Sequence, residues 1–218
     1  MVCYLVPDHA PVIVAAKRTP IGRRGGVFSE IHPHELLAQA QQAAIGAEEC
    51  PHSAIDVLIT GCVTQLGEQS YNVRRLAALA AGYPVEVPGF TVNAQCGSSQ
   101  QAVNIAAAMI GSGAADVILA SGVESMSRVS LGFHRQNGPG DPLSKGFRER
   151  YEDLAVGESV ERMADAWGIG RLDWIAGLTD RNHWRPKQET RVNSRTRSYP
   201  SPSGTSRSSK MKGFGIHR

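Results

Sequence analysis

The sequence predicts an α/β fold, in which helices cover a β-sheet. Up to about residue 170, short apolar runs alternate with longer, alanine-rich segments of helical periodicity, which is the pattern of such folds. The chain has 218 residues, of which 41% are apolar and 20% are charged. This composition supplies a core for one or two domains and excludes disorder as the general state of the chain. No stretch approaches the roughly 18 apolar residues of a membrane-spanning helix.

The expected elements follow in order along the chain. Residues 12–16 form a continuous apolar run, as expected of a strand that is buried on both faces. Pro33 is suited to the first turn of a helix. The core-facing stripe of this helix comprises Leu36, Leu37, Ala40, Ala43 and Ala44. A second strand is expected at residues 57–60, and a helix at residues 71–81 ends at Gly82.

Two further strands are expected at residues 90–92 and 117–120, with a helix between them. Cys96 is the candidate catalytic residue, because it lies where the first of these strands runs into that helix. At a helix start, unpaired N–H groups and the helix dipole stabilise a thiolate, so the pKa of such a thiol can fall from about 8.5 to roughly 3.5–7.5. The small residues 97–99 leave room for a substrate and leave N–H groups free to hold an oxyanion. This arrangement indicates a nucleophile for acyl transfer. The alternative is that Cys96 is a small, buried apolar side chain.

The segment around Cys96, VNAQCGSS at residues 92–99, resembles the active-site segment of the thiolases, which cleave 3-ketoacyl-CoA or condense acyl-CoA units. Three other segments resemble the same family in the same order, namely VIVAAKRTPIG at residues 12–22, GCVTQ at residues 61–65 and SGVESMS at residues 121–127. The resemblance identifies the chain as a member of this family.

The resemblance covers roughly residues 11–170. Within it, residues 61–67 and 95–97 are most similar to actinobacterial thiolases that act on CoA esters of lipid or sterol side chains. Ser99 departs from the glycine that many relatives carry there, and the additional hydroxymethyl group is small enough to be tolerated.

The fold that this resemblance implies is α/β and thiolase-like: the N-terminal βαβαβαββ half of a layered αβαβα architecture, with the C-terminal half missing. Four regions are expected: an atypical N-terminal extension without an assigned function at residues 1–10, the core of the thiolase N-terminal domain at residues 11–127, a partial loop domain at residues 128–170, and a tail at residues 171–218.

The resemblance also implies a role for Cys96 as the residue that is acylated, with its own N–H contributing to the oxyanion hole. Residues 124–127 are expected to line the floor of the active site, where Met126 either contacts substrate or only packs. Coenzyme A is the implied co-substrate, with no permanently bound cofactor and no metal. The complete enzyme is expected to be a homo-oligomer, dimer or tetramer, that acts on acyl-CoA and not on nucleic acid.

Several other residues are not predicted to take part in the chemistry. The family has no catalytic thiol at the position of Cys62. His32 and His34 are explained as polar residues at a helix start. Arg74 and Arg75 are expected on a solvated helix face or at a subunit contact. The four cysteines have neither CxxC spacing nor the density of a disulfide framework, which suggests reduced thiols and a cytoplasmic protein.

Three motifs that the family uses toward its C-terminus do not occur in this sequence. They are a Gly-His-Pro motif that activates the nucleophile, a Cys-x-Gly motif that handles the proton, and an Asn-Glu-Ala-Phe motif that holds an oxyanion water. The chain is therefore expected to be a catalytically incomplete acyltransferase of the thiolase family. The alternative is a non-catalytic half-thiolase that binds CoA esters or a full-length thiolase subunit.

The tail at residues 171–218 differs in charge from the rest of the chain. The formal charge is −5 up to residue 170 and +8 after it. The basic, Ser/Pro-rich composition predicts disorder, and one interpretation is an arm that binds nucleic acid or an anionic membrane. We favour a shift of the reading frame near Gly170, because codons can be chosen for the tail such that a second frame encodes a thiolase-like peptide.

Overall fold

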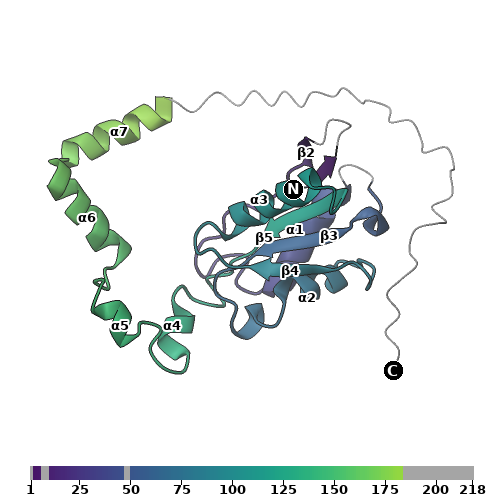
Figure 1. Ribbon diagram of the computed structural model, residues 1–218, viewed down its shortest axis with the longest axis horizontal. Coiled ribbons are helices and arrows are strands. Elements are labelled where there is room, and N and C mark those ends of the chain that lie inside the picture. The colour runs from purple at the N-terminus through teal and green to yellow at the C-terminus, as the bar shows by residue number, and fades with distance from the viewer. Residues whose placement is uncertain (1, 6–9, 47–49, 184–218) are drawn as a thin grey trace. The chain divides into compact units, whose positions relative to one another are not determined.

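The computed structural model describes residues 2–5, 10–46 and 50–183 of the chain. The described residues divide into two units, with the division between Phe147 and Arg148 (Figure 1). The first unit contains a five-stranded sheet, whose strands are β1 (Val2–Leu5), β2 (Pro11–Ala15), β3 (Val57–Gly61), β4 (Gly89–Val92) and β5 (Val117–Gly122). The α/β prediction is confirmed, and so are the four predicted strands.

The strand order in the sheet is β2-β1-β5-β3-β4. Strands β3, β4 and β5 are parallel, with Thr60 opposite both Thr91 and Ser121. Their carboxyl ends therefore meet at one edge of the sheet, where ligands of open α/β sheets are bound. Cys96 follows β4 at this edge.

Strand β1 lies inside the sheet, antiparallel to both β2 and β5. Cys3 is opposite Ile13 on one side and Ile118 on the other. Residues 1–10 were expected to be an extension without a role, but Val2–Leu5 join β2 to the rest of the sheet. The pairing of β1 with β5, which places Cys3 opposite Ile118, joins residues too far apart in the sequence to leave a local signal.

Strand β2 lies at the edge of the sheet, next to β1. The strand predicted at residues 12–16 was expected to be buried on both faces, and this prediction is wrong. Ile13 is 60% exposed, and within β2 only Ala15 is buried. The apolar run specified a strand, but β2 has only one neighbour in the described sheet.

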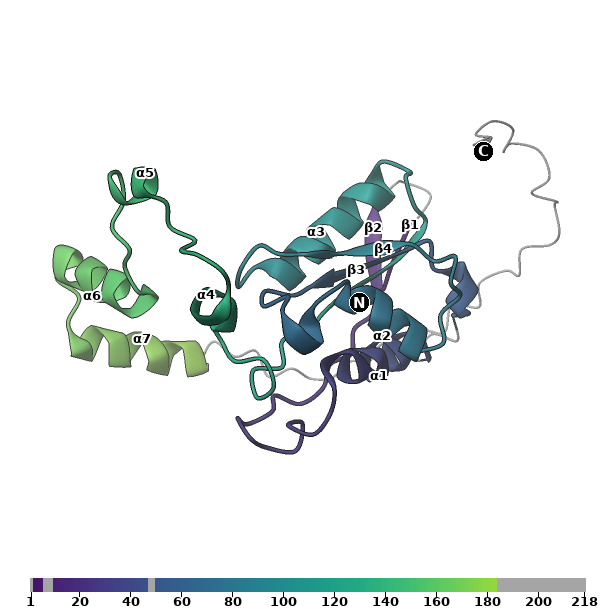
Figure 2. The same cartoon turned by 90° about the horizontal axis from the view of Figure 1, so that it is seen from below.

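Helices cover the two faces of the sheet (Figure 2). Helix α3 (Ser98–Gly111) packs on one face, and helices α1 (Pro33–Gly46) and α2 (Val73–Ala80) lie together on the other. Short 3-10 turns occur at η1 (His52–Ala54) and η2 (Gly67–Gln69). The predicted helices at Pro33 and after Cys96 are confirmed.

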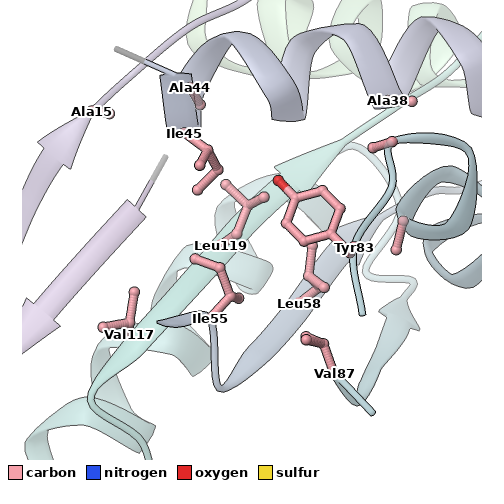
Figure 3. Packing of buried hydrophobic residues seen from close by; sticks show 12 residues of the cluster. Ala15, Ala38, Ala44, Ile45, Ile55, Leu58, Tyr83, Val87, Val117 and Leu119 are labelled. Carbon is pink, nitrogen blue, oxygen red and sulfur yellow. The ribbon is translucent and has the colours of Figure 1, made fainter. Parts of the chain in front are cut away.

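Two apolar cores lie on the two faces, because alternate side chains of a strand point to opposite sides. Leu58 and Leu119 face α1 and α2, in a core that also holds Tyr83 (Figure 3). Their neighbours Ile59 and Ile118 face α3 and pack against its alanines. Burial on both faces explains why these strands read as continuous apolar runs.

The prediction that fails most clearly is the one for Arg74, in helix α2. Arg74 is 1% exposed, although a solvated helix face or a subunit contact was expected, and its guanidinium donates to the Val87 carbonyl at 2.7 Å. The side chain lies against Gly89, where a Cβ would come within 2.6 Å of its Cζ. Burial, and then the neighbouring Arg75, lower the pKa of Arg74 to about 10.

Two short helices follow β5: α4 (Phe133–Asn137) in the first unit and α5 (Lys145–Arg148), which spans the division between the units. The second unit contains α6 (Val156–Trp167) and α7 (Arg171–His183). Helix α7 corrects the prediction that disorder begins at residue 171. The acidic Asp173 in its first turn, whose Oδ2 accepts from the Gly170 N–H at 2.8 Å, favours a helix start at this point. The rest of the predicted tail, residues 184–218, lies outside the described residues, and no described helix is long and apolar enough to cross a membrane.

Candidate active site

Cys96 is exposed, in a sharp turn between β4 and α3. Gln95, immediately before it, has a φ of +51°, in the left-handed region that costs a non-glycine residue free energy. The Gln95 N–H donates to Asn93 Oδ1 at 2.9 Å, and the Gln95 carbonyl accepts from Ser98 Oγ at 2.6 Å. Hydrogen bonds on both sides of Gln95 therefore hold the turn that presents Cys96.

Ser98 ties this turn to the first turn of α3. It is buried, and its Oγ also accepts from the Ala94 N–H at 3.0 Å. Gly97 is the N-cap of α3 and has no side chain with which to cap the helix. The start of a helix carries N–H groups without intrahelical partners, which are donors suited to a developing oxyanion.

The start of α3 approaches the ends of β3 and β5 closely. A Cβ on Gly61 would lie 2.5 Å from the Ser98 carbonyl carbon and 2.7 Å from Ser99 Cα. A Cβ on Gly122 would lie 2.9 Å from Ser99 Cβ and closer still to its Oγ. The additional hydroxymethyl of Ser99 therefore occupies the space beside Gly122.

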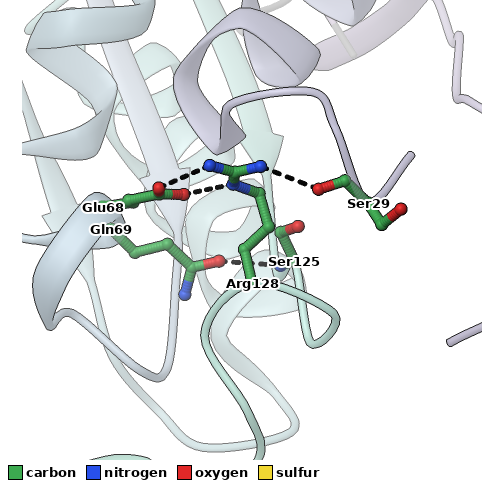
Figure 4. A network of polar contacts seen from close by, with 5 residues as sticks. All are labelled: Ser29, Glu68, Gln69, Ser125 and Arg128. Carbon is green, nitrogen blue, oxygen red and sulfur yellow. Dashed lines mark hydrogen bonds and ion pairs between the residues drawn. The ribbon is translucent and has the colours of Figure 1, made fainter. Parts of the chain in front are cut away.

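A second set of contacts joins the loops that follow β3 and β5. The Glu124 carboxylate accepts from the Val63 N–H at 2.8 Å and from the Thr64 N–H at 3.2 Å. Gln69 is fully buried, and its Nε2 donates to Glu124 Oε1 at 3.0 Å. Its Oε1 accepts from the Ser125 N–H at 2.7 Å (Figure 4). We call Glu124 and Gln69 the loop clamp.

An ion pair lies next to the loop clamp. Glu68 binds the Arg128 guanidinium through both carboxylate oxygens, and Arg128 Nη1 also donates to the Ser29 carbonyl at 2.7 Å (Figure 4). This interaction lowers the pKa of Glu68, chiefly through the hydrogen bonds from Arg128. His32 and His34 lie nearby with their ring centroids 4.0 Å apart. Burial is the main cause of the lowered pKa of His34.

Residues 124–127, the predicted floor of the site, border a cavity of about 690 Å³. Met126 is 50% exposed and lines this cavity. Other lining residues include Ile21, Arg23, Phe28 and Leu131. Among the described residues, no group of three or more histidine, cysteine or acidic side chains could hold a metal ion.

The other described thiols have different surroundings from Cys96. Cys62 is 1% exposed, and burial, with a smaller contribution from Glu124, raises its pKa to about 12. Cys50 is half-buried. Burial supports the prediction that Cys62 has a structural and not a chemical role.

Thiol alkylation should separate these cysteines. In the folded protein at pH 8, iodoacetamide is expected to modify Cys96 first, Cys50 more slowly, and Cys62 only after unfolding, because a buried thiol with a pKa of about 12 is neither accessible nor ionised. Peptide mapping by mass spectrometry at successive times measures this order. Modification of Cys62 as fast as Cys96 in the folded protein would contradict it.

The structure places the predicted residues Cys96 and 124–127 at the carboxyl edge of the parallel strands, but Cys96 does not line the cavity that residues 124–127 border. The sequence did not identify the loop clamp. Gln69 carries no motif of its own, and its partner Glu124 is 55 positions away. The family-like segment at residues 121–127 drew attention to Glu124, its acidic residue. Nothing in that segment shows which N–H groups Glu124 binds.

Comparisons with known proteins agree with this geometry. Residues 11–176 match the model of the thiolase N-terminal domain. The chain is 41% identical over 167 residues to the steroid 3-ketoacyl-CoA thiolase FadA6 of Mycobacterium tuberculosis, covering 73% of this chain and 41% of that protein. It is 37% identical over 180 residues to the beta-ketoadipyl-CoA thiolase of Acinetobacter baylyi, covering 74% of this chain and 44% of the relative.

A solved structure, the acetyl-CoA acetyltransferase of Bacillus anthracis, matches with a TM-score of 0.62 and 34% identity, over 75% of this chain and 43% of that one. This chain spans less than half the length of the relatives described here. The matched family model covers more than half of the chain. The chain therefore belongs to the thiolase family, and the part that matches is the family's N-terminal domain.

Proposed function

We propose that this chain supplies the nucleophile of a thiolase, with Cys96 as the residue that is acylated by a 3-ketoacyl-CoA. The observation that carries the proposal is the exposed thiol in a turn whose left-handed Gln95 is hydrogen-bonded on both sides. An activated nucleophile in acyl transfer needs such an accessible, fixed position. The relatives, named as thiolases and an acetyl-CoA acetyltransferase, support the same reaction class.

The reaction proceeds in two acyl transfers. The Cys96 thiolate attacks the C3 carbonyl of the 3-ketoacyl-CoA, the C2–C3 bond breaks, and C2 takes up a proton, so that acetyl-CoA leaves and an acyl-cysteine remains. The thiol of a second CoA, losing its proton, then attacks the acyl-cysteine and releases the shortened acyl-CoA and the free Cys96. Every step is reversible, and the reverse direction condenses acyl-CoA units. Coenzyme A is a co-substrate here, and the chemistry calls for no resident cofactor.

The proton transfers require groups that a second polypeptide segment would supply. The sequence holds no Gly-His-Pro, Cys-x-Gly or Asn-Glu-Ala-Phe motif. Loss of general acid–base help slows such reactions by about 10²–10⁴-fold, and loss of an oxyanion donor by about 10²–10³-fold. We therefore propose that this chain alone is acylated slowly and does not turn over efficiently.

A second candidate function is that of a non-catalytic half-thiolase, which binds CoA esters or a full-length thiolase subunit. The chain corresponds to 41–44% of the length of the relatives described above. Co-purification of the tagged chain with a complete thiolase, without any acylation of Cys96, would favour this alternative. We further propose that the complete enzyme is a homo-oligomer and is cytoplasmic.

Acylation of the isolated chain tests the leading proposal. Prolonged incubation with excess acetoacetyl-CoA is expected to place one acetyl group on Cys96, detected by intact-protein and peptide mass spectrometry. Cys96→Ala is expected to remain unmodified, because it lacks the nucleophile. Acetylation of Cys50 at the same rate as Cys96, or no acetylation of the folded chain, would contradict the proposal.

A further inference from the structure

We propose that the loop clamp, Glu124 and Gln69, positions Cys96 for acyl transfer by fixing the carbonyl on which the Cys96 turn rests. The inference rests on the proposed role of Cys96. Neither clamp residue is argued to touch the substrate, so both are positioning residues. A path of hydrogen bonds leads from Glu124 through Val63 and Asn93 to the turn.

The path begins at the Glu124 carboxylate. It accepts three N–H groups, those of Val63, Thr64 and the Gln69 side chain, at 2.8, 3.2 and 3.0 Å. Gln69 Nε2 donates in addition to the Thr64 carbonyl at 2.8 Å. The loop after β3 is therefore held from both its N–H and its carbonyl groups, by Glu124 from the loop after β5 and by Gln69 from η2, farther along the same connection.

The path continues through Val63 to the turn. The Val63 N–H is bound to Glu124, and its carbonyl accepts from Asn93 Nδ2 at 3.1 Å. The other end of the same amide, Asn93 Oδ1, accepts from the Gln95 N–H at 2.9 Å. Displacement of the Val63 peptide would therefore move Asn93 and release one of the two restraints on the left-handed Gln95, directly before Cys96.

A carboxylate suits the start of this path better than an amide does. Both oxygens of a carboxylate accept, whereas a glutamine at position 124 would present one NH₂ group to a donor. Either the Val63 N–H or the pair formed by the Thr64 N–H and Gln69 Nε2 would then face another donor. An unsatisfied or repelled buried donor is costly, so the loop after β3 is expected to shift.

The test compares Glu124→Gln with Glu68→Gln. Glu68 lies next to Gln69, but it binds the Arg128 side chain and no amide of the loop after β3, which makes it a matched control. Three quantities are measured on each folded chain: the rate of Cys96 acetylation by acetoacetyl-CoA, the rate of Cys96 alkylation by iodoacetamide, and the hydrogen exchange of the Gln95 amide.

Glu124→Gln is expected to slow acetylation about 10-fold, to change alkylation much less, and to accelerate Gln95 exchange, with Cys62 still protected from alkylation. Glu68→Gln is expected to leave all three quantities unchanged. Glu124→Asp, which keeps the charge, should lie between Glu124→Gln and the native protein. In a double-mutant cycle, Asn93→Ala should mask the effect of Glu124→Gln, because both act on the same path.

Three results would overturn the inference: unchanged acetylation and Gln95 exchange in Glu124→Gln, equal effects of Glu68→Gln, or additive effects with Asn93→Ala. Exposure of Cys62 in Glu124→Asp as well as Glu124→Gln would also overturn it, by showing a role in folding alone. If the native chain is not acetylated, the proposed function has failed, and Gln95 exchange still decides whether the loop clamp acts on the turn.

Discussion

Gly61→Ala is expected to destabilise the protein by about 3 kcal/mol and to slow acylation of Cys96 sharply. A Cβ at this position would lie 2.5 Å from the Ser98 carbonyl carbon, a distance that requires movement of the α3 backbone. Overpacking against backbone costs about 1–3 kcal/mol or more, since no flexible side chain can give way. Because Cys96 lies two residues before Ser98, the same movement displaces the nucleophile. Chemical denaturation and the rate of Cys96 acetylation measure the two effects.

Two other glycines provide controls for this prediction. Gly46, at the end of α1, has open space where its Cβ would be, so Gly46→Ala should change the free energy of unfolding by less than about 1 kcal/mol. Gly122→Ala would contact the Ser99 side chain and not its backbone, so Ser99→Gly should rescue it. The same Ser99→Gly should fail to rescue Gly61→Ala. Rescue of both, or of neither, would contradict the assignment of the contacts.

Local signals in the sequence predicted most elements of the sheet and its helices. Strands such as β3 and β5 are buried on both faces, so their apolar runs are continuous. Gly82, with a φ of +79°, ends the region of α2 as expected, because glycine adopts the left-handed conformation without steric cost. The helix itself begins at Val73 and not at residue 71, since Asn72 caps it and accepts from the Arg75 N–H.

The sequence could not predict features that depend on distant partners. The inward position of Arg74 depends on the absence of a side chain at Gly89, 15 positions later, and on the Val87 carbonyl. A charge pattern alone indicated a solvated face. The exposure of β2 could not be predicted for the same reason, because the position of a strand at the edge of a sheet depends on which strands pair with it.

The candidate site divides in the same way. The turn that carries Cys96 was predictable because its strand, turn and helix start are contiguous, whereas the catalytic role of Cys96 stays a prediction. The loop clamp was not predictable, because its hydrogen bonds join residues 55 to 61 positions apart. Contacts between residues so far apart in the sequence become visible only when the fold is known.

The second large effect is expected from Cys3→Pro, because β1 pairs with strands on both of its sides. Proline lacks an N–H and disrupts a strand that is not at an edge, so the substitution removes a hydrogen bond and forces the chain away from its partners. At position 3 it would disturb pairing opposite Ile13 and Ile118 at once. We expect a loss of about 2–4 kcal/mol in the free energy of unfolding.

Cys3→Val is the matched control, because a β-branched residue suits a strand and keeps the N–H. It should leave the free energy of unfolding within about 1 kcal/mol of the native value. Denaturation by urea measures both variants, and hydrogen exchange of the amides of β2 reports whether that strand is released. If residues 2–5 were an extension without a structural role, Cys3→Pro would unfold at the native urea concentration. A lowered midpoint for Cys3→Pro alone, with faster exchange in β2, requires that β1 join β2 to the parallel strands that carry the Cys96 turn.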